Sequence, residues 1–259
     1  MALTANRVFI SADHGLAVVY FLQSDVLPNL LSAGLEVVLL TDDGLKQQIA
    51  ARFEQPGLTV EGLRFAECRR YFDTYAHSMQ YWLHFLRWMG GSERINTNAM
   101  DGHLRQMAFE ASRRAKLFMP LVRMAVRRLR RSAGARRWLM QQQMAFIPGL
   151  YTSLFEKYQP ALVIASTPGW RWDRYLLREA AQRGVQTAAA IVGWDNPSSY
   201  RLPGAPVDWV TCWSEIQKEE LVLGSDWRPE QVHIGGIPSY AGYFRRTWQM
   251  SRAEYFARH

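Results

Sequence analysis

Short apolar runs alternate with helical patterns along the first 65 residues of the chain. Residues 7–12, 35–40 and 58–65 are apolar runs of strand length, separated by polar turns such as Asp42-Asp43-Gly44. Between these runs, apolar positions recur at helical spacing over residues 17–32 and 45–53, and Pro28 predicts a kink in the first helix. Strands that alternate with helices across short polar links indicate a parallel, doubly wound sheet.

The alternation stops after the third strand and resumes near residue 160. In between, residues 71–89 form an aromatic-rich helical pattern, and residues 101–143 predict one or two basic helices interrupted near Pro120 and Gly134. A further helix is expected over residues 144–158. Strands are then expected at residues 162–165, 186–192, 207–212 and 232–235, with helices at 173–183 and 215–223. We therefore predict an α/β fold, with a doubly wound, mostly parallel, Rossmann-like sheet of about seven strands and a helical insertion over about residues 68–145.

Composition supports a folded chain with one unusual region. Of 259 residues, 48% are hydrophobic and 13% aromatic, which excludes a disordered protein. The net charge is +8, yet no acidic residue lies between Glu110 and Glu156, where ten cations from Arg113 to Arg137 exceed that whole charge. The protein is therefore a near-neutral body with one basic patch, and uniform coating of nucleic acid is a poor interpretation.

Several classes of protein are disfavoured by what the sequence lacks. Cys68 and Cys212 lie far apart and flank no zinc-ligand spacing, so we expect core thiols in a reducing compartment. There is no run of 18 apolar residues and no secretory signal over residues 1–9, which makes the cytoplasm the default location. No dinucleotide fingerprint or Walker loop occurs, and His77 and His84 at i and i+7 need a third partner to bind one metal. A metal-free site is expected.

The candidate site residues follow from one geometric rule. In an open parallel sheet, ligands bind where loops leave the carboxyl ends of the strands. An alternative role for the Asp, Asn, Ser and Gly residues of each such loop is to cap helices and make turns. The loops are Asp13 and His14, residues 41–43, residues 167–170 with Thr167 and Trp170, residues 194–196 (Trp194, Asp195 and Asn196), Ser214 with Glu215, and residues 235–239.

Asp13 and His14 form the most chemically suggestive pair among these loops. An imidazole can accept a proton from an attacking hydroxyl, and a nearby carboxylate can orient it or raise its basicity. Because adjacent residues point in different directions, the sequence does not itself imply a direct contact between the two side chains. One of them is expected to be catalytic.

The basic segment interleaves its arginines with apolar residues from Leu117 to Leu129. Such a helix suits the surface of an anionic membrane, and it equally suits a solvated basic helix whose apolar stripe packs onto the sheet. Nucleic acid is the weaker third option, because the rest of the chain has no known nucleic-acid-binding module. The cations expected to contact a membrane or an acceptor are Arg123, Arg127, Arg128, Arg130 and Arg131.

Motifs in the second half carry a resemblance to a known family. They are Pro160-Ala161-Leu162-Val163-Ile164-Ala165 before a helix, Gly193-Trp194-Asp195-Asn196-Pro197-Ser198-Ser199, the run from Val207 to Glu215, and Val232-His233-Ile234-Gly235-Gly236-Ile237-Pro238. Together they resemble the end of the N-terminal half of bacterial GT-B glycosyltransferases for surface polysaccharides and, more distantly, CDP-glycerol glycerophosphotransferases. The resemblance covers about the last 100 residues. Ser239-Tyr240 departs from it, since many relatives have an aromatic residue and Asp there.

The resemblance implies a function and a domain arrangement. It implies that residues 1–245 form the acceptor-side domain, and that residues 246–259 are a linker and the first helix of a missing C-terminal domain holding most contacts to the nucleotide-sugar donor. Asp13 or His14 would be the base, and Trp194, Asp195 and Asn196 would line the acceptor side of the cleft. Lipid-linked acceptors, a separately encoded C-terminal domain and a peripheral position on the inner face of the cell membrane are the expected partners and location. No tightly bound cofactor is expected.

Two other classes stay open at the level of sequence. The chain can be a non-catalytic docking module that binds a partner chain or an anionic membrane, or half of a protein related to nucleotide-sugar epimerases. As a glycosyltransferase, it is expected to be incomplete without its second domain and to turn over poorly by itself.

Overall fold

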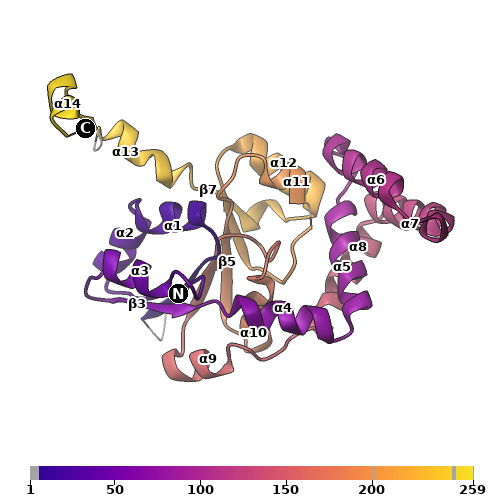
Figure 1. Cartoon of the computed structure of the whole chain (residues 1–259), viewed down its shortest axis with the longest axis horizontal. Helices are drawn as coiled ribbons and strands as arrows, with labels where there is room; N and C mark the ends of the chain where they lie inside the picture. Colours follow the sequence, from indigo (N-terminus) through magenta and orange to yellow (C-terminus); the bar gives the residue numbers. More distant parts are fainter. Residues whose placement is uncertain (1–5, 201, 247–248, 259) are drawn as a thin grey trace.

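A seven-stranded parallel sheet forms the centre of the molecule in the computed structural model, which describes residues 6–200, 202–246 and 249–258 (Figure 1). The strand order is β3-β2-β1-β4-β5-β6-β7, and every described pairing is parallel. The predicted α/β, doubly wound fold is confirmed. The strands are β1 (Arg7–Ala12), β2 (Glu36–Thr41), β3 (Leu58–Gly62), β4 (Leu162–Ala165), β5 (Gln186–Ala190), β6 (Trp209–Cys212) and β7 (Val232–Ile234).

Successive residues of each central strand point to opposite faces, and each face has its own core. Val8 and Ile10 of β1 pack with the helices α1 to α3, whereas Phe9 packs with α4, α9 and α10. This two-sided burial explains why the strands are continuous apolar runs rather than alternating ones. The helices next to the sheet are α1 (Gly15–Leu22), α2 (Val26–Ser32), α3 (Lys46–Arg52), α4 (Phe65–Thr74), α9 (Thr152–Tyr158), α10 (Arg174–Gln182), α11 (Asn196–Tyr200) and α12 (Glu215–Ser225).

The insertion after β3 forms a separate helical lobe on one side of the sheet (Figure 1). Its own small core joins Phe85 and Met89 of α5 to Met100 of α6 and Val126 of α7. The lobe therefore packs mainly on itself, and its basic helix does not lie on the sheet. Its helices are α5 (His77–Met89), α6 (Asn98–Glu110), α7 (Arg113–Arg131) and α8 (Ala133–Gln142), followed by the 3-10 turn η1 (Gln143–Ala145).

The last elements lie beyond β7 and extend away from the sheet (Figure 1). Arg245 pairs with Asp25 and ties this segment to the start of α2. The helix expected at the end of residues 246–259 is present, and His259 lies outside the described residues. The remaining elements are the 3-10 turns η2 (Pro229–Gln231) and η3 (Pro238–Tyr240), with α13 (Ala241–Phe244) and α14 (Arg252–Arg258).

Several helix boundaries differ from those predicted. The helix expected over residues 17–32 divides at Gln23 to Asp25, and Pro28 falls in the first turn of α2, where its missing N–H costs nothing. The pattern over residues 71–89 divides at Ala76, whose φ of 46° is left-handed. The helix expected over residues 144–158 is only α9, because Pro148 and Gly149 precede it.

The interruption predicted at Pro120 is wrong, because α7 continues through it. Pro120 is exposed, while Val126 and Leu129 on the opposite side of the helix are buried against the lobe. Tertiary packing therefore outweighs the hydrogen bond that proline cannot make. The interruption expected near Gly134 is confirmed at Ser132, whose Oγ accepts a hydrogen bond from the N–H of Ala135 at 3.2 Å and caps α8.

The lobe is fixed to the sheet domain by buried arginines. Arg136 of α8 makes a two-pronged ion pair with Asp226, with Nε–Oδ2 at 2.5 Å and Nη2–Oδ1 at 2.7 Å. Arg87 of α5 is fully buried and donates from Nη1 to the carbonyl of Leu202 at 2.7 Å. These contacts attach the helical lobe to the end of α12 and to the segment between α11 and β6.

Two glycines allow the loop after β4 to touch the loop before β6. The N–H of Gly204 donates to the carbonyl of Pro168 at 2.8 Å, and Gly169 has a left-handed φ of 80°. A Cβ on Gly204 would stand 1.7 Å from the carbonyl oxygen of Gly169. The side chain of any other residue would therefore force the two backbones apart.

We expect Gly204→Ala to lower the free energy of unfolding by about 1–3 kcal/mol, because the obstructing atoms are backbone and cannot rotate away. Urea denaturation followed by circular dichroism measures this. Gly102→Ala in α6 is the matched control, since a Cβ there meets nothing within 4 Å and alanine favours the helix by up to about 1 kcal/mol. Equal stability of the two variants would contradict the close contact between the backbones of Gly204 and Gly169.

Candidate functional site

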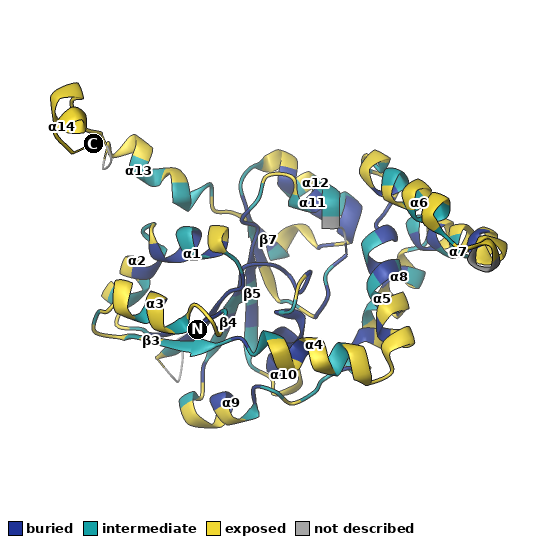
Figure 2. Cartoon of the chain, in the orientation of Figure 1, coloured by how far each residue is buried: buried dark blue, intermediate teal, exposed yellow. Residues whose placement is uncertain are grey.

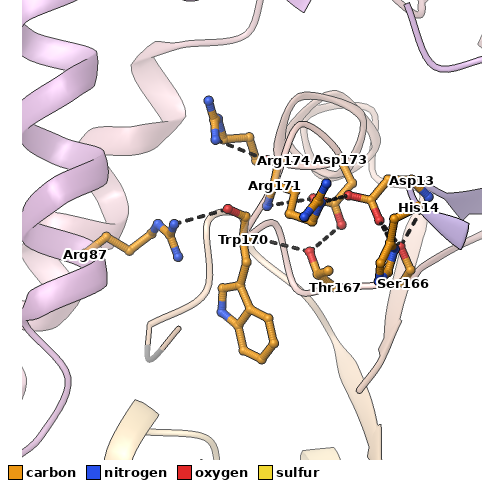
Figure 3. Close-up of polar contacts among 9 residues, drawn as sticks. All are labelled: Asp13, His14, Arg87, Ser166, Thr167, Trp170, Arg171, Asp173 and Arg174. Atoms are coloured by element: carbon orange, nitrogen blue, oxygen red, sulfur yellow. Dashed lines mark hydrogen bonds and ion pairs between the residues drawn. The ribbon is translucent and has the colours of Figure 1, made fainter. Parts of the chain in front are cut away.

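The site lies at the topological switch point of the sheet, between β1 and β4. From there the chain adds β2 and β3 on one side and β5 to β7 on the other. β1 pairs with β2 on one side and with β4 on the other, so the loops after β1 and β4 leave the same edge of the sheet at neighbouring strands. In open parallel sheets, ligands bind at such a switch point. The first loop holds Asp13 and His14, and His14 is the N-cap of α1. The second runs from Ser166 to Asp173, the N-cap of α10. Figure 3 shows these two loops meeting side chain to side chain.

The carboxylate of Asp13 is completely buried and has a polar or charged partner at each oxygen (Figure 3). Oδ1 accepts a hydrogen bond from Ser166 Oγ at 2.7 Å and lies 2.8 Å from His14 Nδ1. Oδ2 lies 2.7 Å from Arg171 Nε. The His14 and Arg171 contacts are ion-pair distances whose angles fall outside hydrogen-bond geometry. The structure thus places Asp13 and His14 in direct contact, which their adjacent positions in the sequence did not by themselves imply.

Burial acts to raise the pKa of Asp13, but His14, Ser166 and Arg171 outweigh it and lower the pKa below its usual value. Asp13 is therefore ionised at neutral pH. An ionised carboxylate beside Nδ1 favours the imidazole tautomer that carries its proton there, which leaves Nε2 as the basic nitrogen. A quarter of the His14 side chain is exposed to solvent.

A second buried carboxyl, Asp173, lies behind the first. Its Oδ2 accepts a hydrogen bond from Thr167 Oγ1 at 2.6 Å, and its Oδ1 accepts one from the backbone N–H of Arg171 at 3.2 Å. Burial and the negative charge of Asp13 raise the pKa of Asp173 to about 7. The two carboxyls thus have different roles. Asp13 supplies the negative charge of the site, and Asp173 holds the loop that carries Arg171.

Buried cations of neighbouring helices hold this loop and the segment before β6 that touches it. Arg87 donates from Nη2 to the carbonyl of Trp170 at 3.3 Å and contacts His84 Nδ1 at 3.1 Å. Burial and nearby arginines lower the pKa of His84 to about 2, so its ring is neutral and accepts from Arg87. Arg178 of α10 donates to the carbonyl of Gly204 at 2.8 Å. His84 is therefore a structural residue.

The residues predicted on the loop after β4 turn inward. Thr167 is buried against Asp173, and the Trp170 side chain, only 2% exposed, packs with Ile191 and Val210. Both shape the loop from within, and neither offers a free face to a ligand. In contrast, Trp194 on the loop after β5 is 74% exposed. Gln217 holds that loop by donating from Nε2 to the carbonyls of Gly193 and Trp194.

The other predicted positions take local roles at helix starts. Ser214 caps α12, its Oγ accepting from the N–H of Gln217, and Glu215 lies exposed in the first turn of that helix. Asp195 is exposed, and Asn196 begins α11. Of the positions selected by the loop rule, the structure brings only Asp13, His14 and the loop of Thr167 and Trp170 into one cluster.

Sequence reasoning missed Ser166, Arg171 and Asp173. Ser166 and Arg171 follow the same predicted strand as Thr167, so the loop rule reaches their position. Their contact with Asp13 depends on β1 pairing with β4, which are separated by the whole insertion. The sequence pattern predicts that Asp173 begins a helix, and it is the N-cap of α10. That position does not indicate that its carboxyl is buried.

Comparisons with known proteins leave the family open. Neither a family model nor a curated protein matches this sequence. Among residues 6–200, 202–246 and 249–258, no group of three or more His, Cys, Asp or Glu side chains is placed to hold a metal ion. Within the same ranges, no helix has the length and apolar character needed to cross a bilayer.

We expect the Asp173 carboxyl to lower the thermal stability on the order of 5 °C as the pH rises from 5 to 7. Buried His84, whose pKa is lowered to about 2, acts in the opposite direction up to about pH 6.5, because only the unfolded state protonates it there. The contribution of Asp173 is therefore measured as the difference between the protein and its Asp173 variant. The raised pKa of Asp173 means that the folded state holds a proton there that the unfolded state releases, so stability is lost as the pH passes through about 7. Asp173→Asn should remove this dependence, and Asp73→Asn on exposed α4 should preserve it. Differential scanning calorimetry across pH checks both, and an unchanged slope in Asp173→Asn would contradict the assignment.

Proposed function

We propose that this chain is the acceptor-binding half of a GT-B glycosyltransferase that acts in cell-surface polysaccharide synthesis at the inner face of the cell membrane. The observation that carries the proposal is the buried Asp13 carboxylate beside His14 at the switch point of the sheet. The all-parallel sheet and the family-like motifs of the second half support it.

In the proposed reaction, His14 Nε2 takes the proton from an acceptor hydroxyl as its oxygen attacks the anomeric carbon of a nucleotide sugar. The bond from that carbon to the phosphate oxygen breaks, and the nucleoside diphosphate leaves with the bonding electron pair. Asp13 stabilises the imidazolium that forms, as a buried carboxylate does behind a catalytic histidine. Arg171 is paired to Asp13 and half-exposed, and in this proposal it adds positive charge near the developing negative charge of the leaving group.

Trp194 supplies a surface for the acceptor in this proposal. The loop after β5 lies two strands from the loop after β1, which is about 10 Å at the usual strand spacing. An exposed indole at that distance can stack against a sugar ring whose hydroxyl reaches His14. Asp195, exposed beside it, can accept hydrogen bonds from sugar hydroxyls.

Acceptor binding is testable on the chain as it stands. We expect the protein to bind a subset of saccharides on a glycan array, and Trp194→Ala to weaken that binding about tenfold through loss of stacking. Trp138→Ala, which removes another exposed tryptophan on α8, should bind as the unmodified chain does. Equal losses in the two variants would show that Trp194 is no acceptor surface.

In this proposal the catalytic role of His14 requires a donor-binding domain, so turnover is measured with this chain joined to one. Release of nucleoside diphosphate from a panel of nucleotide sugars measures turnover. His14→Gln should lower kcat by about 10²–10⁴ with little change in the donor KM. His233→Gln on β7 is the control. Unchanged kcat in His14→Gln would exclude it as the base, and ordinary enzyme rates from the present chain would contradict the two-domain part of the proposal.

A further inference from the structure

Helix α7 carries apolar residues on two opposite faces. One face, with Val122, Val126 and Leu129, is buried in the lobe. The other carries Leu117, Leu121 and Met124, which are 77%, 57% and 62% exposed. Their spacing of four and then three residues places them on one stripe of the helix. Packing within the lobe accounts for the first stripe only, so the second needs another explanation.

The cations of α7 divide in the same way between structural and free groups. Arg130 Nη1 lies 2.6 Å from Asp101 Oδ1, and Arg131 pairs with Glu93, so these two predicted contact residues serve the lobe itself. Arg123, Arg127 and Arg128 are exposed and make no ion pair with any residue that the structure describes. The exposed apolar stripe is therefore accompanied by cations without carboxylate partners.

A cavity of about 590 Å³ lies between α5, α6 and α7, next to this surface. Its walls are mainly apolar and aromatic, and include Trp82, Phe85, Met107 and Phe118. Phe118 and Trp82 are themselves partly exposed, so they connect the cavity to the outer surface of the lobe. The volume falls within the range of about 300–1,000 Å³ that is usual for small-ligand sites.

We infer that the outer face of α7 docks on an anionic phospholipid bilayer, with Leu117, Leu121 and Met124 inserted among the acyl chains and Arg123, Arg127 and Arg128 on the headgroup phosphates. The adjacent cavity takes an acyl chain from the same bilayer. This inference rests on the peripheral attachment included in the proposed function, and it is independent of the transfer reaction.

The combination of charge and apolar exposure favours a bilayer over other occupants. A nucleic acid would satisfy the arginines but leave three large aliphatic side chains in water. A bilayer satisfies both groups, because its headgroups are anionic and its interior is apolar. Figure 2 shows that exposed residues continue along α6 and α7 on the side of the lobe away from the sheet, where a flat surface can approach.

Co-sedimentation with vesicles tests the charge requirement. We expect the full chain to bind vesicles of equimolar phosphatidylcholine and phosphatidylglycerol, and to bind pure phosphatidylcholine at least about tenfold more weakly. The double variant Arg127→Glu, Arg128→Glu should weaken binding to the anionic vesicles by a similar factor. The matched control is Arg69→Glu, Arg70→Glu, an adjacent exposed pair on α4.

The apolar requirement has its own pair of variants. Leu121→Ser should weaken binding to the anionic vesicles several-fold. Ile216→Ser should not, although Ile216 on α12 is an even more exposed aliphatic residue. Lipids brominated along the acyl chain should quench part of the tryptophan fluorescence, and Trp82→Phe should remove a quenched part that Trp138→Phe leaves. Circular dichroism of each variant confirms folding.

Three results would overturn the inference: vesicle binding that does not depend on phosphatidylglycerol, equal losses in the α7 and α4 arginine pairs, or tight binding to duplex RNA or DNA without binding to vesicles. Because none of these measurements uses a sugar donor, their failure leaves the proposed reaction untouched. Conversely, loss of turnover in His14→Gln says nothing about the bilayer.

Discussion

The buried negative charge of Asp13 is the constraint on which the rest of the candidate site depends. A lone carboxylate in that position would be strongly destabilising, so it requires partners that approach from outside its own loop. Ser166 and Arg171 supply them, and both can do so only because β4 lies beside β1. The pairing of two strands that are distant in sequence therefore decides the charge state of the site.

Much of the fold follows from local sequence because the sheet is buried on both faces. Strands such as β1 and β4 are short, continuous apolar runs, which is the pattern of a strand buried on both faces of a sheet. Helix boundaries were harder to predict, since packing kept α7 continuous through Pro120 and local geometry at Ala76 divided another helix. Helix propensity gives only a weak preference at such positions, and tertiary contacts can override that preference.

The site was predictable in position and only partly in composition. The loop rule selects Asp13 and His14, because it depends on topology that the apolar pattern already indicates. The loop rule cannot distinguish a side chain that is exposed at the site from one that is buried beneath the loop and supports it. Trp170 and Thr167 therefore turned out to be buried, Ser214 is a helix cap, and the contact of Arg171 with Asp13 carries no signal in the sequence.

The buried guanidinium of Arg87 has a consequence for how the lobe can be exchanged between proteins. It belongs to α5, yet its hydrogen bonds end on the carbonyls of Trp170 and Leu202 in the sheet domain. Cutting out the lobe, or transplanting it onto another sheet, would remove the hydrogen bonds that Arg87 donates to those carbonyls, one of which lies in the loop that carries Arg171. The lobe is thus a continuous segment of chain, but it cannot be transferred to another protein alone. The two loops that Arg87 contacts would have to be transferred with it.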